Sequence, residues 1–383
     1  MTRKMMVGLI VGALVIVAGL MSLRPIKVEA TVSAGGAPQS DIVPGVAVPR
    51  FEADTTWPSL PNGWKLGITS AIAVDQHDHV WILQRPRLEH HPSDAPPVIE
   101  IDENGNYVQG WGGPAEDYDW PYSEHGIAID DDENVWITGN NPYAGTGSDS
   151  SDDMLLKFTK TGEFVLQIGG RDVSQGNTDT RSVHTATDVS AYQNEIFVSD
   201  GYGNRRVIVF DANTGAFKRM WGAFGNEPLD EPPAADLERM AAGETGAGPK
   251  QFSGVPHNIG VSNDGLVYVS DRGNRRIQVF TTEGEYVTQG FVNRDAEGLT
   301  TAGIAFSPDP EQRFLYTPDF HWGHVWVLDR KTLRVLYKFG EETGSPGDFR
   351  EPHDIAADSK GNLYVAEVAG GARAQKLVLK GIS

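Results

Sequence analysis

Residues 255–280, VPHNIGVSNDGLVYVSDRGNRRIQVF, decide the fold. Two runs of alternating apolar residues, HNIGVS and LVYVSD, flank the turn sequence NDG, and GNRR leads into a third run, IQVF. Alternating runs that are separated by glycine-containing turns are typical of antiparallel strands. A histidine directly after a proline and an arginine at the end of the second run do not fit that pattern. We therefore ask whether His257 and Arg272 belong to the sheet or to a site.

The same pattern returns five more times, which makes six copies. Most copies are followed by a third run, a turn such as TKTGEF, and a fourth run. Four short antiparallel strands in each of six units predict an all-β fold, a six-bladed β-propeller of NHL-type repeats. The sixth copy ends after its third run, KLVL. We expect residues 45–67 to supply the missing strand, which would close the ring and remove the sheet edges. The other copies begin at residues 70, 125, 187, 302 and 353.

The first 30 residues differ in composition from the rest. Arg3 and Lys4 precede an apolar run at residues 7–23, and a V-x-A sequence ends at Ala30, which together predict a secretory signal peptide. A run of this length also fits an uncleaved signal anchor. We expect export to the periplasm or the extracellular space, with residues 7–23 as the sole membrane anchor if the segment is retained.

The remaining chain divides into a short connector and the repeats. Residues 31–45 are expected to be a flexible stalk, and residues 46–383 the propeller. Residues 144–153 and 226–250 are interpreted as inserted loops because of their composition, the second with one helical turn at ADLERMA.

Charge and cysteine content exclude several classes of function. The formal net charge is −20 at pH 7, whereas nucleic-acid binding needs a basic surface. The chain has no cysteine. Disulfides, thiolate metal sites and a cysteine nucleophile are therefore excluded.

Histidine occupies one position of the repeat in alternate copies only. In a propeller the first strand of each blade lines the central channel, so equivalent positions form a ring around the axis. Three imidazoles from alternate blades can converge there and leave a coordination position open, as in catalytic zinc sites. Each histidine alone could instead be a hydrogen-bonded structural residue, and other divalent metals also suit imidazole. The six equivalent residues are Ser70, His125, Thr187, His257, Ala302 and His353.

Two arginines and a tyrosine are expected in the layer next to this ring. Arg85 and Arg272 end the second runs of their copies, and Tyr202 follows one residue later in its copy. A guanidinium group matches a carboxylate, and a tyrosine beside a metal and an arginine can act as a base. The arginines of the two NRR sequences, at 205–206 and 275–276, are interpreted as blade scaffold.

The ordered set of Arg85, HGIAID with His125, SDGYGN with Tyr202, PHNIGV with His257, DR with Arg272 and PHDIAA with His353 resembles the peptidyl-α-hydroxyglycine α-amidating lyase family. The resemblance covers about residues 65–380. It implies a carbon–nitrogen lyase that cleaves an N-acyl-α-hydroxyglycine, such as a peptide with a C-terminal hydroxyglycine, to an amide and glyoxylate. Animal members carry disulfides where this chain has Gly203 and Tyr268, and no copper mono-oxygenase domain is present here.

The resemblance also implies the roles of individual residues. His125, His257 and His353 would hold a catalytic zinc ion, Tyr202 would take the proton of the substrate hydroxyl, and Arg85 would steer the carboxylate or assist the tyrosine. Arg272 would complete the positive pocket. A structural calcium ion would bind Asp354 and the backbone carbonyls of Ile72 and Ile127.

Two other functions remain open at this point. One is a calcium-dependent lactonase or esterase of the six-bladed type, against which three ring histidines argue because such sites favour carboxylate and asparagine ligands. The other is a non-catalytic NHL scaffold that binds protein or glycan and needs no metal.

Overall fold

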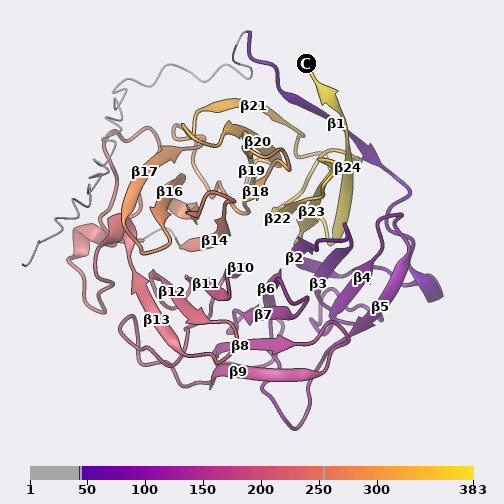
Figure 1. The fold of residues 1–383 in the computed structure, drawn as a ribbon, viewed down its shortest axis with the longest axis horizontal. Helices are drawn as coiled ribbons and strands as arrows, with labels where there is room; N and C mark the ends of the chain where they lie inside the picture. Colours follow the sequence, from indigo (N-terminus) through magenta and orange to yellow (C-terminus); the bar gives the residue numbers. More distant parts are fainter. Residues whose placement is uncertain (1–42, 44, 253–254) are drawn as a thin grey trace, which may run out of the picture. The chain divides into compact units, whose positions relative to one another are not determined.

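Six antiparallel sheets, each of four strands, follow one another around a common axis (Figure 1). The computed structural model describes residues 43, 45–252 and 255–383. Contacts divide the chain into residues 1–33 and 34–383, and all the described residues belong to the second unit. The fold is an all-β six-bladed propeller, as the repeats predict. The predicted signal peptide or anchor, and almost all of the predicted stalk, lie outside the described residues.

The blades follow the order of the chain. Blade one comprises β2 (Ile68–Val74), β3 (Val80–Arg85), β4 (Val98–Ile101) and β5 (Tyr107–Trp111). Blade two comprises β6 (Glu124–Ile129), β7 (Val135–Gly139), β8 (Asp152–Phe158) and β9 (Phe164–Arg171). Blade three comprises β10 (Asp188–Tyr192), β11 (Glu195–Asp200), β12 (Arg206–Asp211) and β13 (Phe217–Trp221). Blade four comprises β14 (Pro256–Val261), β15 (Leu266–Asp271), β16 (Arg276–Thr281) and β17 (Tyr286–Phe291). Blade five comprises β18 (Ala305–Phe306), β19 (Phe314–Asp319), β20 (His324–Asp329) and β21 (Val335–Phe339). Blade six comprises β22 (Pro352–Ala357), β23 (Leu363–Glu367), β24 (Arg373–Ile382) and β1 (Pro49–Asp54).

Helical structure among the described residues is limited to four short 3-10 turns. None of these helices is long and apolar enough to cross a bilayer. The turns are η1 (Pro61–Gly63), η2 (Ala223–Gly225), η3 (Ala234–Asp236) and η4 (Arg272–Asn274).

In blades two and six, the turn between the first two strands is built around an aspartate. In blade two, Oδ1 of Asp130 accepts hydrogen bonds from the backbone N–H groups of Asp132 (3.1 Å) and Asn134 (2.8 Å). In blade six, Asp358 binds the N–H groups at positions 360 and 362 in the same way. A side chain that binds backbone groups a few residues ahead stabilises a tight turn. The D-x-x-x-N spacing of these repeats therefore determines where the hairpin reverses.

Alternate side chains of each central strand pack into two different inter-blade cores. In β3, Val80 and Ile82 pack against blade six, whereas Trp81 and Leu83 pack against blade two. Six such clusters lie between the six pairs of neighbouring blades. Because both faces of these strands are buried, their sequences read as continuous apolar runs such as VWIL.

Buried arginines of the NRR sequences join neighbouring strands of their own blade and bind the loops that precede it. Arg206 donates from Nε to Asp200 (2.8 Å), and Arg276 donates from Nε to Asp271 (2.7 Å), with all four side chains fully buried. Arg275 binds the carbonyl of Met240 (2.6 Å) in the long loop at residues 226–250. These contacts confirm the scaffold interpretation for the three arginines.

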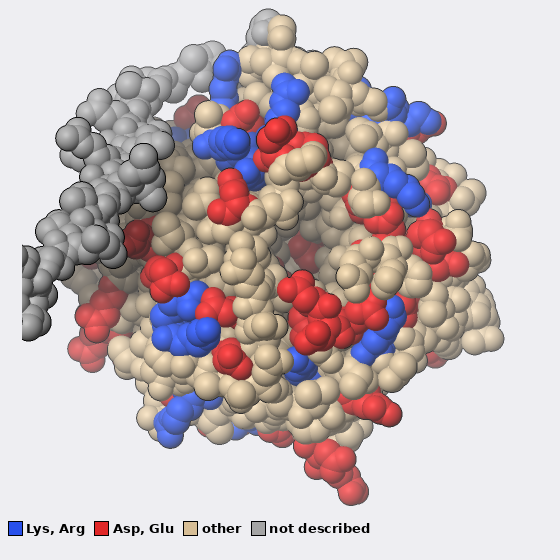
Figure 2. All heavy atoms as spheres, in the orientation of Figure 1, with Lys and Arg blue, Asp and Glu red and all other residues tan. Residues whose placement is uncertain are grey.

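The first strand of each blade lies nearest the axis (Figure 1). Strand β2 contacts β6 and β22, and β10 contacts β6 and β14, so the inner strands form a continuous ring. Figure 2 shows one face of this ring, which is hollowed at its centre and has acidic side chains close to the hollow. The inner strands therefore place their side chains around one shared axial space.

Strand β1 closes the ring, as predicted. It pairs antiparallel with β24 over residues 49–54 and 376–382, and so completes the sixth sheet with a strand from the other end of the chain. Its Phe51 packs against Phe339 (ring centroids 5.2 Å apart) and Tyr316 (5.9 Å) of blade five. Closure leaves β24 with partners on both sides.

Two boundaries differ from the sequence-based expectations. Residues 144–153 were expected to form a loop, but Asp152 and Asp153 already belong to β8, where Asp152 accepts backbone hydrogen bonds from two neighbouring segments. In blade four, β15 ends at Asp271, and Arg272 begins η4 instead of ending the strand.

Removal of β1 should destabilise the whole propeller. A chain that begins at residue 55 loses the β1–β24 hydrogen bonds and the Phe51 contacts, and we expect its free energy of unfolding to fall by more than about 3 kcal/mol relative to a chain that begins at residue 43. Urea denaturation followed by tryptophan fluorescence measures the difference. Equal midpoints for the two chains would show that closure by β1 is dispensable.

Candidate metal centre

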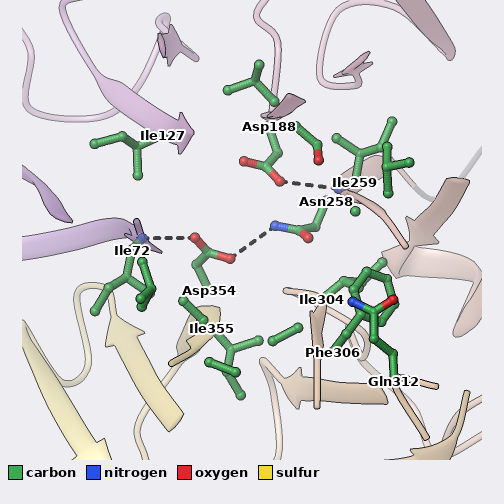
Figure 3. Close-up of a pocket in the computed structure, with 18 residues that line it drawn as sticks. Ile72, Ile127, Asp188, Asn258, Ile259, Ile304, Phe306, Gln312, Asp354 and Ile355 are labelled. Carbon is green, nitrogen blue, oxygen red and sulfur yellow. Dashed lines mark hydrogen bonds between the residues drawn. The ribbon is translucent and has the colours of Figure 1, made fainter. Parts of the chain in front are cut away.

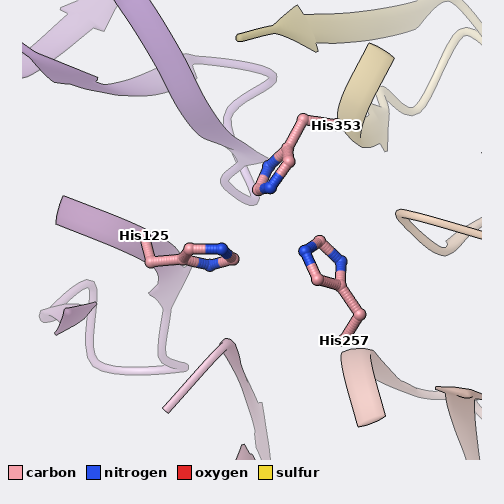
Figure 4. Close-up of side chains that lie close together, drawn as sticks. All are labelled: His125, His257 and His353. Atoms are coloured by element: carbon pink, nitrogen blue, oxygen red, sulfur yellow. The ribbon is translucent and has the colours of Figure 1, made fainter. Parts of the chain in front are cut away.

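Three histidine side chains converge on the axis (Figure 4). His125, His257 and His353 are the second residues of β6, β14 and β22, and their ring centroids lie 4.6–5.1 Å apart. One ligand nitrogen from each lies within 4.8 Å of the other two. The structure thus brings together the three residues that the repeat alignment singled out.

A β-bulge turns these histidines out of the ladder. Pairing shifts between Pro256 and Asn258 in blade four, so His257 has no partner on β15, and the same shift occurs around His353 in blade six. A bulge adds a residue to one strand and re-aims its side chain. The bulge therefore points an imidazole along the axis from a strand that is otherwise regular.

Each histidine is oriented by the neighbouring blade. The carbonyl oxygen of Thr187 accepts from Nδ1 of His125 (2.5 Å), and that of Ala302 accepts from Nδ1 of His257 (2.7 Å). Ser70 provides the same contact for His353 (2.6 Å). A carbonyl can only accept, so Nδ1 carries the proton and Nε2 keeps its lone pair. Thr187, Ala302 and Ser70 occupy the ring position in the blades without a ring histidine, and their carbonyl groups orient the three histidines.

The environment keeps the imidazoles neutral. Burial is the main cause that holds the pKa values of all three histidines well below the usual range, and Arg272 adds to it at each of them. Arg85 contributes at His125 and His353, and the neighbouring histidines contribute at His125 and His257. Nε2 of His257 is buried and has no hydrogen-bond partner among the described residues. An unpartnered buried acceptor beside two similar ones fits a bound divalent cation, since imidazole binds metals in its neutral form.

Tyr202 and Arg272 lie directly beside the histidines. The hydroxyl of Tyr202 is 3.3 Å from Nε2 of His125 and accepts a hydrogen bond of 3.2 Å from Nη2 of Arg272. Tyr202 is 41% exposed, whereas Arg272 is buried and its Nε has no hydrogen-bond partner in the described part of the chain. A buried guanidinium with a free N–H group is suited to bind an anionic group of a ligand.

Arg85 reaches the same centre but is held by the protein. Its Nε donates to the carbonyl of Glu124 (2.6 Å), its Nη2 donates to Oδ1 of Asn140 (3.3 Å), and its guanidinium lies 4.4 Å from the ring centre of Tyr143. The side chain is buried. Arg85 therefore supplies a fixed positive charge whose position depends on blade two.

Asp152 fixes the backbone of the segments whose residues bind Arg85. Its carboxylate accepts from the backbone N–H groups of Tyr122 (3.0 Å), Ser123 (3.1 Å) and Asn141 (3.0 Å). The hydroxyl of Ser123 in turn donates to Oδ1 of Asn140, the oxygen that binds Arg85. Burial raises the pKa of Asp152 to about 6.

A second layer of polar groups lies on the axis around an adjoining cavity of 270 Å³ (Figure 3). Oδ2 of Asp354 accepts from the N–H of Ile72 (2.9 Å), and Oδ1 accepts from Nδ2 of Asn258 (3.1 Å). Asp188 faces them and accepts from the N–H of Ile259 (3.2 Å). The structure thus places the predicted calcium residues Asp354, Ile72 and Ile127 around one cavity and adds Asp188 and Asn258.

Two glycines make room for the carboxylates. A Cβ atom at Gly126 would lie 2.8 Å from Asp188, and one at Gly303 would lie 3.0 Å from Asp354. Burial raises the pKa of Asp354 to about 7, and burial together with Asp354 raises that of Asp188 well above its usual value. Two carboxyl groups this close favour either a shared proton or a bound cation.

Sequence reasoning missed Asp188 and Asn258, although the signal was present. Both directly follow a ring position, as Asp354 directly follows His353. The residues that follow the six ring positions therefore form a second ring. Their comparison across the repeats reveals Asp188 and Asn258 beside Asp354.

A second group of metal-ligand type lies outside the axis. Asp75, His79 and Glu100 are close together. His79 already contacts Glu100 (2.7 Å), and Nζ of Lys160 lies 3.5 Å from Glu100 and 3.6 Å from Asp75. The ammonium group balances these carboxylates, so we interpret the group as an ion-pair network.

The raised pKa of Asp152 should be visible in how the free energy of unfolding changes with pH. A carboxyl whose pKa is about 6 when folded and near 3.8 when unfolded stabilises the fold most at low pH, and this contribution is lost as the pH rises to about 6. We expect the free energy of unfolding of the wild type, relative to Asp152→Asn, to fall by about 3 kcal/mol between pH 4 and pH 7. Urea titrations at each pH measure it, and a difference that rises with pH would contradict the assignment.

Comparisons with known proteins agree with this fold. An NHL repeat model matches residues 254–280. Peptidyl-glycine alpha-amidating monooxygenase B of Xenopus laevis is 27% identical over 352 residues, which cover 84% of this chain and 35% of that protein. Peptidyl-alpha-hydroxyglycine alpha-amidating lyase 1 of Drosophila melanogaster is 24% identical over 375 residues, which cover 86% of this chain and 61% of that protein. The chain thus spans about a third of the length of the frog protein.

Other similar proteins carry different names. NHL repeat-containing protein 3 of Mus musculus is 26% identical over 355 residues, which cover 86% of this chain and 84% of that protein. Among solved structures, streptogramin B lyase superposes with a TM-score of 0.52 at 14% identity, covering 86% of this chain and 98% of that one, which supports the fold alone. The chain is thus a six-bladed NHL-repeat propeller with sequence similarity to the peptidyl-α-hydroxyglycine α-amidating lyases.

Proposed function

We propose that this protein is a zinc-dependent lyase that cleaves the N–C bond of an N-acyl-α-hydroxyglycine and releases an amide and glyoxylate. The observation that carries the proposal is the neutral, oriented histidine trio with Tyr202 and Arg272 at hydrogen-bond distance from each other beside it. The similarity to proteins named amidating lyases supports the same reaction class.

The chain's own residues supply orientation and proton transfer in this proposal. His125, His257 and His353 hold the cation, which when bound acts as a Lewis acid on the substrate hydroxyl. The base at Tyr202 would be its phenolate oxygen, which lies where it can take the proton of that hydroxyl, and the phenol O–H so formed would supply the proton to the amide nitrogen. As the C–N bond breaks, its electron pair stays on the amide nitrogen, which gains a proton, while the former hydroxyl carbon becomes the aldehyde of glyoxylate.

The two arginines are assigned different tasks. Arg272, whose Nε has no partner within residues 43, 45–252 and 255–383, binds the substrate carboxylate. Arg85 has its Nε and Nη2 engaged by blade two, and its positive charge favours binding of the anionic substrate. The sequence left two roles for Arg85, to steer the carboxylate or to assist the tyrosine, and this proposal gives the first of them to Arg272.

The second axial layer is proposed to hold a structural calcium ion. Oxygen ligands suit calcium, and Asp354, Asp188 and Asn258 present side-chain oxygens on the axis. We further propose that Ile72 and Ile127, which line the same cavity, contribute backbone carbonyls. Such an ion would join blades one, two, three, four and six at their inner strands.

The substrate and location are also proposals. The apolar run at residues 7–23 favours export to the periplasm or the extracellular space, either as a free protein or anchored by that run. A peptide that ends in hydroxyglycine is then the natural substrate class, and an oxygenation step must supply its hydroxyl group.

One observation favours a second candidate. The carboxylates and asparagine of the axial layer are the ligand types of a calcium-dependent lactonase or esterase. In that case a lactone or ester would be hydrolysed in the presence of calcium, and the histidines would be dispensable. A non-catalytic scaffold would bind no catalytic metal at all.

Metal content and glyoxylate release test the lyase. The purified full chain should carry about one zinc ion, and N-benzoyl-α-hydroxyglycine should yield glyoxylate. His257→Ala should lose the zinc and reduce turnover at least about a hundredfold, since it removes one of three ligands. Mass spectrometry of the metals and a coupled glyoxylate assay provide the readouts.

The matched control is His324→Ala. Nδ1 of His324 also donates to a backbone carbonyl, that of Gly340 (2.7 Å), but the residue lies outside the centre. This variant should keep its zinc. Tyr202→Phe should keep zinc and lose turnover. A wild-type protein free of metal would overturn the proposal, and a zinc protein without glyoxylate release would remove the assigned substrate.

Calcium binding has its own variant. Asp354→Asn removes one negative charge from the axial layer, and we expect it to lose calcium while its fold persists. Calcium at a hundred times its Kd adds about 2.7 kcal/mol to the free energy of unfolding. The midpoint of wild-type unfolding should therefore rise with calcium, and that of Asp354→Asn should not. A calcium response in both proteins would place the ion elsewhere.

A further inference from the structure

A small apolar cluster borders the metal centre and is not used by the proposed chemistry. Ile68, Leu88 and Val368 are its buried members. Tyr143, Phe320 and Ala369 pack against them and are only partly buried. These side chains come from blades one, two, five and six, so the cluster is assembled from segments far apart in sequence.

The cluster is continuous with the site at both ends. The ring of Phe320 lies 6.2 Å from that of His353, and the guanidinium of Arg272 lies 5.3 Å from the ring centre of Phe320. At the other end, Tyr143 packs against the guanidinium of Arg85. A ligand at the histidines therefore has an apolar surface within reach of its next few atoms.

Polar and apolar groups are divided around the axis. Tyr202 and Arg272 come from blades three and four, which contribute nothing to the cluster. The cluster lies over the blades that follow them around the ring. A substrate whose carboxylate is bound by Arg272 and whose hydroxyl faces Tyr202 must direct its third substituent, the N-acyl group, away from blades three and four.

We propose that the partly exposed surface formed by Phe320, Tyr143 and Ala369 binds the acyl side of the substrate and selects apolar acyl groups. The proposal rests on the lyase function proposed above and adds the substrate class. The six members of the cluster include no charged side chain. The two guanidinium groups beside it are already engaged, that of Arg85 by Glu124 and Asn140 and that of Arg272, in this proposal, by the substrate carboxylate. A charged acyl group would therefore lose hydration there without gaining a free partner. An aliphatic or aromatic acyl group would instead cover the exposed edges of Phe320 and Tyr143.

The test compares two substrates of the same shape. N-(4-methylpentanoyl)-α-hydroxyglycine and N-succinyl-α-hydroxyglycine differ in an isopropyl group against a carboxylate. We expect kcat/KM for glyoxylate release by the full chain to be at least about tenfold higher for the apolar substrate. Phe320→Ala should lower kcat/KM for the apolar substrate about tenfold and leave the acidic one within about threefold, which reduces the ratio.

Trp322→Ala is the matched control. Trp322 is an exposed aromatic residue of the same loop, and its indole donates to the carbonyl of Glu297. It does not belong to the cluster. Its truncation should leave the ratio of the two substrates unchanged. Ala369→Asp offers a second test that keeps the aromatic packing, and it should lower the ratio by adding a charge to the surface.

The outcomes separate this inference from the lyase itself. Glyoxylate release from both substrates at equal efficiency, or a ratio that neither Phe320→Ala nor Ala369→Asp changes, would overturn the inference and leave the lyase intact. Glyoxylate release from neither substrate, with zinc bound, would overturn the lyase and the inference together.

Discussion

The centre of this molecule depends on one kind of hydrogen bond, from Nδ1 of a ring histidine to the carbonyl of the next blade. Three such bonds fix the tautomer and direction of His125, His257 and His353 at once. They require neighbouring inner strands to keep their relative height, which the inter-blade cores provide. The precision of the site is thus set by the packing of apolar side chains far from the axis.

The six-fold repeat could be predicted because its physical signals are local. Alternation, aspartate turns and apolar runs such as VWIL recur in the sequence, and a ring of blades follows from their number. Convergence of His125, His257 and His353 followed from the repeat register. The closing strand followed from the missing fourth run of the last copy, since an open edge strand is unfavourable.

Other features could not be derived in this way because they depend on tertiary contacts. The bulge at His257 leaves no mark in an alternating sequence. The different surroundings of Arg85 and Arg272 arise from Asn140 and Tyr143 of another blade, so their equivalent places in the repeat did not distinguish them. The hydrogen bonds that Asp152 accepts could not be predicted, because the residue lies in a segment whose composition is that of a loop.

Closure by β1 also determines when the three histidines can come together during synthesis of the chain. The third histidine lies in the only sheet that joins the two ends of the described chain, because blade six combines β22–β24 with β1. Strand β1 is translated before the other described strands and β22–β24 after those of the other five blades, so the sixth sheet can pair its strands only when all five have emerged. The three histidines therefore come together last, when the ring closes.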